Sequence, residues 1–495
     1  MMSADRERDT QTVEVLILGG GLCGVAAAIE LGRAGINDVV IVERSGSVGG
    51  TWHHNTYPGC AVDIPSHVYC FSYALKPDWS RVYATQAELE AYIGGVVDDF
   101  GVRDKVRLQT EVLDARWDGG NQRWHVITNR GVFQARFFVI AAGPLHEPII
   151  PTLLGQDLFQ GTAFHSSRWP ADTDLAGHRV VAIGTGASAI QFVPAVQRQV
   201  GKLTLLQRTP SWVLPKPDWE ITETSKRRLA RIPLLMRIIR VLTWLVLDTF
   251  TTGAIRSQRF AGVLGFLGRL HIRWWIKDGA TRKALTPRYS PTCKRLLFSN
   301  DFYRALAQPN IDLVTSPAVE LREHSVVTAD GREIPADTVI YGTGFQTLQH
   351  HPVAERIRGR SGETLAEVWK GNPKAHMGTT ISGFPNAFLM FGPNAGTLSG
   401  FTMAEAQAKY LVGAIREANR LGVAALDVNA AAQEEFVAEA DRMLSKSTFA
   451  LGGCDSYYLA EGHRRVSLPW PGTMYSLTRR LRRFDPASYE FVGRL

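Results

Sequence analysis

The stretch Val13-Glu14-Val15-Leu16-Ile17-Leu18-Gly19-Gly20-Gly21-Leu22-Cys23-Gly24 places an apolar run directly before a glycine-rich turn. An alanine-rich stretch follows, which indicates a strand, a tight turn and a helix in that order. In this context the glycines let the backbone approach a pyrophosphate that rests on the helix N-terminus. Gly19, Gly21 and Gly24 are therefore predicted to hold a dinucleotide.

A second unit of the same kind begins at Arg179. Its apolar run Arg179–Ile183 is followed by Gly184-Thr185-Gly186-Ala187-Ser188-Ala189 and then by a helical stretch. One such match is a weak signal, because glycine-rich turns also serve plain strand-to-helix connections. Two matches in the right context predict two bound dinucleotides, with Gly184, Gly186 and Ser188 around the second. The fold class expected is α/β with two Rossmann-like dinucleotide-binding domains.

The second strand of each unit distinguishes the two dinucleotides. Asp38–Val42 ends in Glu43-Arg44, and a carboxylate at this distance binds a ribose 2′-hydroxyl and repels a 2′-phosphate. Lys202–Leu206 ends in Gln207-Arg208-Thr209, where a guanidinium and a hydroxyl suit a 2′-phosphate. FAD is therefore expected in the first unit, with Glu43 and Arg44 among its contacts, and NADPH in the second.

The order of these units along 495 residues predicts an interleaved domain organisation. We expect an FAD-binding domain from residues 1–150 and 388–495, and an NADPH-binding domain from residues 175–213 and 290–385. Residues 151–174 would link the two domains. Residues 214–289 are rich in helical and basic patterns and read as a helical insertion into the NADPH domain.

Amino-acid composition says little about binding partners, but it gives information about the cellular compartment. The 55 Lys and Arg exceed the 47 Asp and Glu by 8, which indicates a mildly basic surface, and no nucleic-acid partner is predicted. The five cysteines form no CxxC pair and are odd in number, so we expect no disulfide framework and a reducing, cytoplasmic location. The charged start from Met1 to Thr12 is unlike a secretory signal. No metal site is predicted.

The longest apolar stretch runs from Ile232 to Ala254. Arg237, Arg240 and Asp248 interrupt it, so a membrane-spanning helix is not expected. Helical spacing on one face predicts an amphipathic helix packed on the protein, and the residues of that face are Ile232, Leu235, Met236, Ile239, Leu242 and Val246. A membrane-surface role is the alternative, given the nearby Lys226, Arg227, Arg228 and Arg231.

Two further motifs carry a family resemblance. Phe159-Gln160-Gly161-Thr162-Ala163-Phe164-His165-Ser166-Ser167-Arg168-Trp169-Pro170 matches FxGxxxHxxxW[PD], and Gly49-Gly50-Thr51-Trp52 is followed by Tyr57-Pro58-Gly59 and Asp63. The chain thereby resembles the type I Baeyer–Villiger monooxygenases over nearly its whole length. The resemblance implies that FAD, NADPH and O2 convert a ketone into an ester or lactone through a C4a-peroxyflavin. It also implies cofactor contacts at Gly50, Thr51, Trp52, Asp63 and Asn394.

The resemblance assigns further roles one residue at a time. In the fingerprint of Phe159, Gly161, His165 and Trp169, the histidine would link domain motion with the cofactor and would not carry out the chemistry. Lys294 would join Arg208 and Thr209 around the 2′-phosphate. Arg295 and Asp63 would form the catalytic pair, because a fixed guanidinium stabilises peroxide and alkoxide charge. An ordinary salt bridge between domains is the alternative for that pair.

Some segments depart from the family pattern and leave the substrate open. Gly396-Thr397-Leu398-Ser399-Gly400-Phe401 replaces the usual Gly-His-Asn/Thr-Ser run, and Ser456-Tyr457-Tyr458 replaces Ser-Trp-Tyr. Trp244, Phe250, Trp274 and Trp275 of the insertion suggest a bulky apolar ketone. The alternatives are an N- or S-oxygenase with the same cofactors, a flavin disulfide reductase, and a membrane-associated interaction protein.

Overall fold

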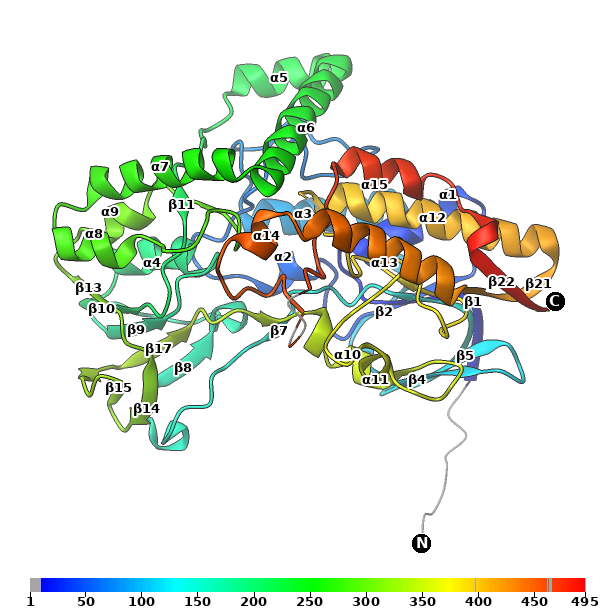
Figure 1. Ribbon diagram of the computed structural model, residues 1–495, viewed down its shortest axis with the longest axis horizontal. Coiled ribbons are helices and arrows are strands. Elements are labelled where there is room, and N and C mark those ends of the chain that lie inside the picture. The colour runs from blue at the N-terminus through cyan, green and yellow to red at the C-terminus, as the bar shows by residue number, and fades with distance from the viewer. Residues whose placement is uncertain (1–9, 397, 461, 463–464, 495) are drawn as a thin grey trace, which may run out of the picture.

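Two sheets lie side by side in the computed structural model, one in the right half and one in the left half of Figure 1. The structure describes residues 10–396, 398–460, 462 and 465–494. Residues 1–9 of the expected FAD domain and Thr397 of the departing segment lie outside these ranges. Each sheet contains one of the two strand–glycine–helix units, as expected from the sequence.

The first sheet has eight strands in the order β19-β4-β5-β6-β1-β2-β3, with β20 also paired to β6. In its central strand β1, Val15, Leu16 and Ile17 are fully buried, as a parallel strand covered on both faces requires. Helix α1 (Leu22–Arg33) follows the glycine turn and packs on α12 (Gly400–Leu421). The strands are β1 (Thr10–Leu18), β2 (Val39–Val42), β3 (Val106–Arg107), β4 (Val112–Asp118), β5 (Arg123–Thr128), β6 (Gly131–Ile140), β19 (Ile357–Arg358) and β20 (Ala387–Leu389).

The second sheet has five parallel strands in the order β13-β10-β9-β17-β8. Helix α4 (Ala189–Gln197) follows its glycine turn, and the antiparallel β14-β15-β16 sheet flanks it. The strands are β8 (Thr162–His165), β9 (Arg179–Ile183), β10 (Lys202–Leu206), β13 (Ile311–Val314), β17 (Thr338–Tyr341), β14 (Ala318–Arg322), β15 (Ser325–Thr328) and β16 (Glu333–Pro335). Strand β8 comes from residues 151–174, so this segment is part of the sheet as well as a link. Buried Phe164 holds it there.

The chain returns to the first unit earlier than the sequence suggested. Strand β18 (Phe345–Gln346) pairs with β7 (Glu147–Pro148), and β19 already belongs to the first sheet. The first sheet thus already includes Ile357–Arg358, residues that the expected boundary between 385 and 388 assigned to the NADPH-binding domain. Both β18 and β19 are two residues long, too short to show the alternation that reveals a strand.

The expected insertion contains the four helices α5 (Glu223–Arg231), α6 (Pro233–Arg256), α7 (Gln258–Trp275) and α8 (Gly279–Leu285). In Figure 1, α5 and α6 stand at the top, and α7 and α8 lie toward the left. The predicted inner face of α6 is partly wrong. Met236 is buried, but Ile232, Leu242 and Val246 are exposed. The helix is apolar on most of its circumference. Arg240 and Asp248 decide which side faces the protein, because Arg240 donates to the backbone carbonyl of His67 and Asp248 accepts from the backbone N–H of Met474.

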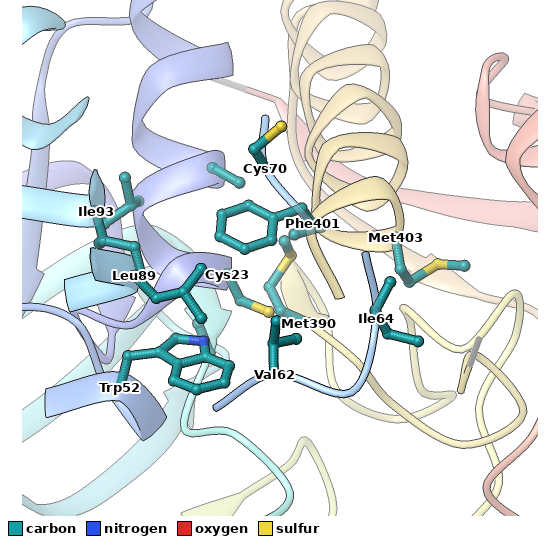
Figure 2. Packing of buried hydrophobic residues seen from close by; sticks show 14 of the residues in the cluster. Cys23, Trp52, Val62, Ile64, Cys70, Leu89, Ile93, Met390, Phe401 and Met403 are labelled. Carbon is teal, nitrogen blue, oxygen red and sulfur yellow. The ribbon is translucent and has the colours of Figure 1, made fainter. Parts of the chain in front are cut away.

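One hydrophobic core joins the two units. It contains Val15 and Ile17 of β1 together with Val180 and Ala182 of β9. Figure 2 shows Cys23, Trp52, Val62 and Phe401 gathered at one point of this core, although they are far apart in the sequence. The remaining helices and strands are α2 (Thr51–His54), α3 (Gln86–Asp99), α9 (Phe302–Leu306), α10 (Val353–Arg356), α11 (Leu365–Trp369), α13 (Ala430–Leu444), α14 (Thr448–Leu451), α15 (Met474–Leu481), β11 (Val213–Leu214), β12 (Leu297–Phe298), β21 (Val423–Val428) and β22 (Tyr489–Arg494).

Candidate active site

A single cavity of about 1310 Å³ runs between the two units. Pockets for one small ligand are typically about 300–1,000 Å³, so this cavity suits more than one large ligand. It brings together most of the sequence-predicted site residues from both units and from the loops between them. They are Gly19, Gly21, Glu43, Arg44, Gly50, Thr51, Trp52, Asp63, Gly184, Gly186, Ser188, Arg208, Thr209, Lys294 and Arg295.

The glycine turns are built for close approach of the backbone. A Cβ at Gly24 would lie 1.9 Å from the carbonyl oxygen of Gly19, so only glycine lets α1 start this close to β1. Gly184 has φ +107°, and a Cβ there would lie 2.4 Å from the carbonyl oxygen of Gly342. Gly24 does not line the cavity itself; it packs the turn that does. Both turns therefore fit a phosphate group at a helix N-terminus.

Glu43 follows the last residue of β2 directly. Its Oε2 accepts a hydrogen bond from Gly20 N at 2.7 Å, and its Oε1 accepts one from Ser45 N at 2.8 Å. These bonds hold the carboxylate beside the glycine turn, where a ribose hydroxyl is expected. The neighbouring Arg44 pairs with Glu147 at 2.5 Å and with His146, so its guanidinium is already engaged by the protein.

Two cationic side chains, Arg208 and Lys294, lie beside the second glycine turn. Lys294 and Arg208 line the same cavity, and the pKa of Lys294 is lowered by burial and by the positive charge of Arg208. Thr185 Oγ1 donates to Thr209 O at 3.0 Å and ties the glycine turn to the end of β10. Two like charges held close to each other provide a site for a multiply charged anion such as a phosphate.

Asp63 and Arg295 form a bidentate pair, 232 residues apart in sequence. Arg295 Nε donates to Asp63 Oδ2 at 2.9 Å, and Nη2 donates to Oδ1 at 2.8 Å. The charge of Asp63 raises the pKa of Arg295 well above its ordinary value. Among the described residues nothing accepts from Nη1. Both residues line the cavity, and the side chain of Arg295 is 40% exposed.

A disulfide between Cys293 and Cys454 lies directly before Lys294 and Arg295 in the chain. The sequence predicted no disulfide framework, and it gave no indication of this one bond. The two cysteines are 161 residues apart, and sequence spacing carries no information about such a contact. The bond brings the C-terminal segment to the site, where Tyr457 and Tyr458 line the cavity and help to raise the pKa of Arg295.

The fingerprint residues Phe159, Gly161, His165 and Trp169 lie outside the cavity wall. His165 is buried at the end of β8, with Nδ1 2.9 Å from Ser167 Oγ, and burial lowers its pKa to about 4. It is therefore neutral near pH 7 and is not present as the imidazolium that a general acid would need. Trp169 packs edge-on against Phe164 with ring centres 5.0 Å apart.

Asn394 also lies outside the cavity wall. Its side chain is fully buried; Oδ1 accepts from Arg465 Nη2 at 2.7 Å, and Nδ2 donates to the carbonyl oxygens of Val466 and Pro469. These contacts tie the loop of Asn394 to residues 465–469, and a cofactor contact of Asn394 stays a prediction. Of the four aromatic residues singled out in the insertion, Phe250 lines the cavity and Trp274 is 81% exposed.

Gln191 of α4 is a cavity residue that the sequence did not reveal. Its Oε1 accepts from Tyr57 Oη at 3.0 Å, and its Nε2 donates to Ala61 O at 2.9 Å. These bonds connect the second unit to the loop that carries Asp63. A glutamine inside a helix gives no local signal of such a role. Lys216 adds a similar bridge, since its Nζ donates to Val62 O at 3.0 Å.

The free thiols on the cavity wall do not support disulfide-reductase chemistry. Cys23 and Cys60 line the cavity, but burial raises the pKa of each to about 12. A thiolate is the reactive form, and neither group reaches it near pH 7. Among the described residues no group of histidine, cysteine and acidic side chains could hold a metal ion.

Two nucleotide-binding units around one cavity, with a guanidinium–carboxylate pair on its wall, define a flavin-dependent, pyridine-nucleotide-linked oxidoreductase. The family model of pyridine nucleotide-disulphide oxidoreductases matches residues 16–238. The whole chain is 42% identical over 492 residues to a Baeyer–Villiger monooxygenase of Streptomyces coelicolor, covering 99% of this chain and 94% of that one. The chain belongs to the Baeyer–Villiger monooxygenases.

Further relatives agree with this family. A Baeyer–Villiger monooxygenase of Pseudomonas aeruginosa is 38% identical over 97% of this chain and 91% of its own length. An FAD-binding monooxygenase of Aspergillus niger is 32% identical over 94% of this chain and 79% of its own. An oxidised steroid monooxygenase bound to NADP superimposes with a TM-score of 0.87 at 26% identity, covering 98% of this chain and all of that one. The protein is an FAD- and NADPH-dependent monooxygenase.

Proposed function

We propose that this monooxygenase inserts one oxygen atom of O2 beside the carbonyl of a bulky apolar ketone to give an ester or lactone. The observation that carries the proposal is that one cavity is lined by both glycine turns and by the Asp63–Arg295 pair. Bound FAD supplies the activation of O2, with NADPH as the source of electrons. The flavin-peroxide route expected from the sequence belongs to this proposal.

Arg295 supplies the charge stabilisation that the reaction needs. Asp63 engages Nε and Nη2, which fixes the plane of the guanidinium on the cavity wall and leaves Nη1 available to a bound reactant. A guanidinium stays protonated and stabilises the negative charge that develops on the substrate's carbonyl oxygen. Asp63 is thus a positioning residue, and Arg295 is the catalytic residue.

The ketone site is proposed where the insertion meets the loop of Arg295. Thr292 Oγ1 donates to Ala254 O at 3.0 Å, so the C-terminal part of α6 lies against the residues that precede Arg295. Phe250, Ala254 and Ile255 of that part line the cavity, as does Phe449 of α14. An apolar wall of this kind favours a hydrocarbon-rich ketone. Arg208, Thr209 and Lys294 are proposed to hold the 2′-phosphate of NADPH.

Replacing Arg295 tests the proposal. We expect Arg295→Ala to retain FAD and to lose roughly a hundred- to a thousandfold in ester formation, because one preorganised donor is typically worth that much. NADPH consumption would continue and end in hydrogen peroxide. Arg295→Lys would recover only part of the ester yield. The measurement is NADPH consumed, peroxide released and ester formed, quantified in the same reaction.

Arg179→Ala is the matched control. Arg179 also pairs in a bidentate manner, with Asp337, but outside the cavity. It should keep the wild-type ratio of ester to NADPH. A wild-type ester yield from Arg295→Ala would leave Arg295 as a structural partner of Asp63 and would remove the catalytic assignment. A panel of ketones, sulfides and amines separates ester formation from N- or S-oxygenation.

A further inference from the structure

The helical insertion concentrates exposed apolar side chains. Of the 24 large apolar side chains that are exposed among the described residues, 12 lie between Ile232 and Trp274. We call this set the insertion face. Its members are Ile232, Leu234, Ile238, Val241, Leu242, Leu245 and Val246 near and on α6, and Val263, Phe266, Leu267, Leu270 and Trp274 on α7.

These residues form stripes and are not scattered. Ile238, Leu242 and Leu245 follow the i, i+4, i+7 spacing of one helix face, while Arg240 lies on the opposite side of α6. Val263, Phe266, Leu267 and Leu270 repeat the same pattern on α7. Exposed apolar stripes of this kind mark an interaction site.

Two charged side chains of α6, Arg240 and Asp248, fix the inner side of the helix to the rest of the protein. Arg240 Nη1 donates to the carbonyl oxygens of His67 and Val68 at 3.0 and 3.2 Å. Asp248 Oδ1 accepts from Met474 N at 2.7 Å. Of the helices in the described part of the chain, α6 is the one long and apolar enough to cross a membrane, but these bonds hold it against the body. Its outer side is therefore presented along the surface.

The same segment contains the whole positive excess of the protein. Residues 223–288 hold fourteen Lys and Arg against three Asp and Glu, a net charge of +11. The complete chain carries +8, so all other residues together carry −3. Arg227, Arg228 and Arg231 of α5 are exposed, and α5 stands beside the outer end of α6 at the top of Figure 1. Apolar stripes bordered by exposed arginines are typical of helices that lie in the interface of a bilayer.

We infer that the insertion face docks on an anionic lipid bilayer, with α6 and α7 in the interfacial plane. Charge decides between a bilayer and a second copy of the chain. In a two-fold symmetric dimer the same surface meets itself, so two strongly positive faces would be brought together. An anionic bilayer instead neutralises them, and each Lys or Arg near such a surface adds to the attraction.

Docking would also place the cavity next to the bilayer. Val246 is 67% exposed on the insertion face and is at the same time part of the cavity wall. An apolar ketone dissolved in the lipid would then meet the cavity without crossing water. This route rests on the proposed function, whereas the docking itself does not.

Flotation of the FAD-loaded protein with vesicles tests the docking. The wild type should float with vesicles of equimolar phosphatidylcholine and phosphatidylglycerol and should stay behind with phosphatidylcholine alone. Ile238→Gln/Leu242→Gln/Leu245→Gln removes apolar contact, and none of the three residues lines the cavity. Arg227→Gln/Arg228→Gln/Arg231→Gln removes charge and should weaken partitioning roughly a hundredfold. Both variants should keep wild-type activity on a water-soluble ketone.

The matched control is Leu113→Gln/Leu154→Gln/Leu158→Gln, three exposed leucines away from the insertion. It should float like the wild type. Absence of wild-type flotation, or equal flotation of the apolar variant, would overturn the inference. The inference would also be overturned if sedimentation velocity showed a wild-type dimer and a monomeric apolar variant. The insertion face would then bind a second copy of the chain and not a bilayer. Flotation needs no turnover, so its result is independent of the ester assay.

Discussion

Two arginines on the wall of one cavity have different surroundings that suit different tasks. Arg295 is locked by the carboxylate of Asp63, so its charge is partly offset and its plane is fixed. Arg208 has Lys294 as its neighbour, and among the described residues no carboxylate pairs with it. The partly neutralised and fixed guanidinium of Arg295 suits a reacting centre, where the hydrogen-bond donor must not move. Two neighbouring positive charges suit the binding of a phosphate.

Arg208→Ala therefore tests the NADPH site at the scale of one residue. We expect the Michaelis constant for NADPH to rise roughly ten- to hundredfold, since a charge-assisted hydrogen bond is worth about 1.5–3 kcal/mol. The Michaelis constant for NADH should stay unchanged, because NADH has no 2′-phosphate. Steady-state kinetics with both coenzymes gives the comparison, and the exposed Arg198→Ala in the same domain is the control. An equal rise for both coenzymes would remove Arg208 from the phosphate site.

At the scale of elements, the loop before β12 is shaped by the C-terminal segment. Ser290 N donates to Gly452 O at 2.9 Å, Thr292 Oγ1 lies 2.7 Å from Thr448 Oγ1, and Cys293 is bonded to Cys454. Helix α14 and the residues after it thus hold the segment that carries Lys294 and Arg295. Loops set by distant elements in this way position side chains more firmly than their own sequence could.

The cysteine pairing has a direct chemical readout. Protein purified without reductant, unfolded and treated with iodoacetamide should take up three groups, at Cys23, Cys60 and Cys70. After reduction it should take up five, since Cys293 and Cys454 are then free thiols. Intact-mass spectrometry distinguishes the two numbers. Five groups without reductant would show that the purified chain lacks the disulfide and would restore the original expectation from the sequence.

At the scale of the whole molecule, buried histidines couple folding to pH. Burial lowers the pKa of His165 to about 4, and it lowers those of His54 and His351 to about 4 and that of His146 to about 3. An unfolded chain titrates its histidines near pH 6.5. Above that pH the imidazoles are neutral in both states. Between pH 6.5 and 4 only the unfolded chain gains protons, so stability falls as the pH falls.

His165→Gln isolates one of these contributions outside the cofactor cavity. The loss of unfolding free energy between pH 6.5 and 4 should be smaller than in the wild type by on the order of 3 kcal/mol, from about 2.5 pKa units at 1.36 kcal/mol each. Urea unfolding at pH 7, 6, 5 and 4 measures it. The exposed His324→Gln serves as the reference variant. If His165→Gln showed the same pH dependence as the wild type, the pKa of His165 would be the same in the folded and the unfolded chain.

The sequence by itself determined the features that depend on neighbouring residues. Each strand, glycine turn and helix that binds a dinucleotide is a continuous stretch, so its periodicity and its glycines could be recognised without any tertiary contact. Glu43 and Arg208 could be assigned because each follows its strand directly. Family motifs then brought Asp63 and Arg295 together, and the structure joins them at hydrogen-bond distance.

The tertiary structure alone decided the features that depend on residues far apart in the chain. Helical spacing shows which residues of α6 share a face, but not which apolar face has a partner; Arg240 and Asp248 settle that through bonds to residues 67, 68 and 474. The same holds for the partner of Cys293, for the pairing of β19 with the first sheet, and for the hydrogen bonds that bury the side chain of Asn394. Each depends on which distant segments pack together, and local periodicity carries no record of that packing.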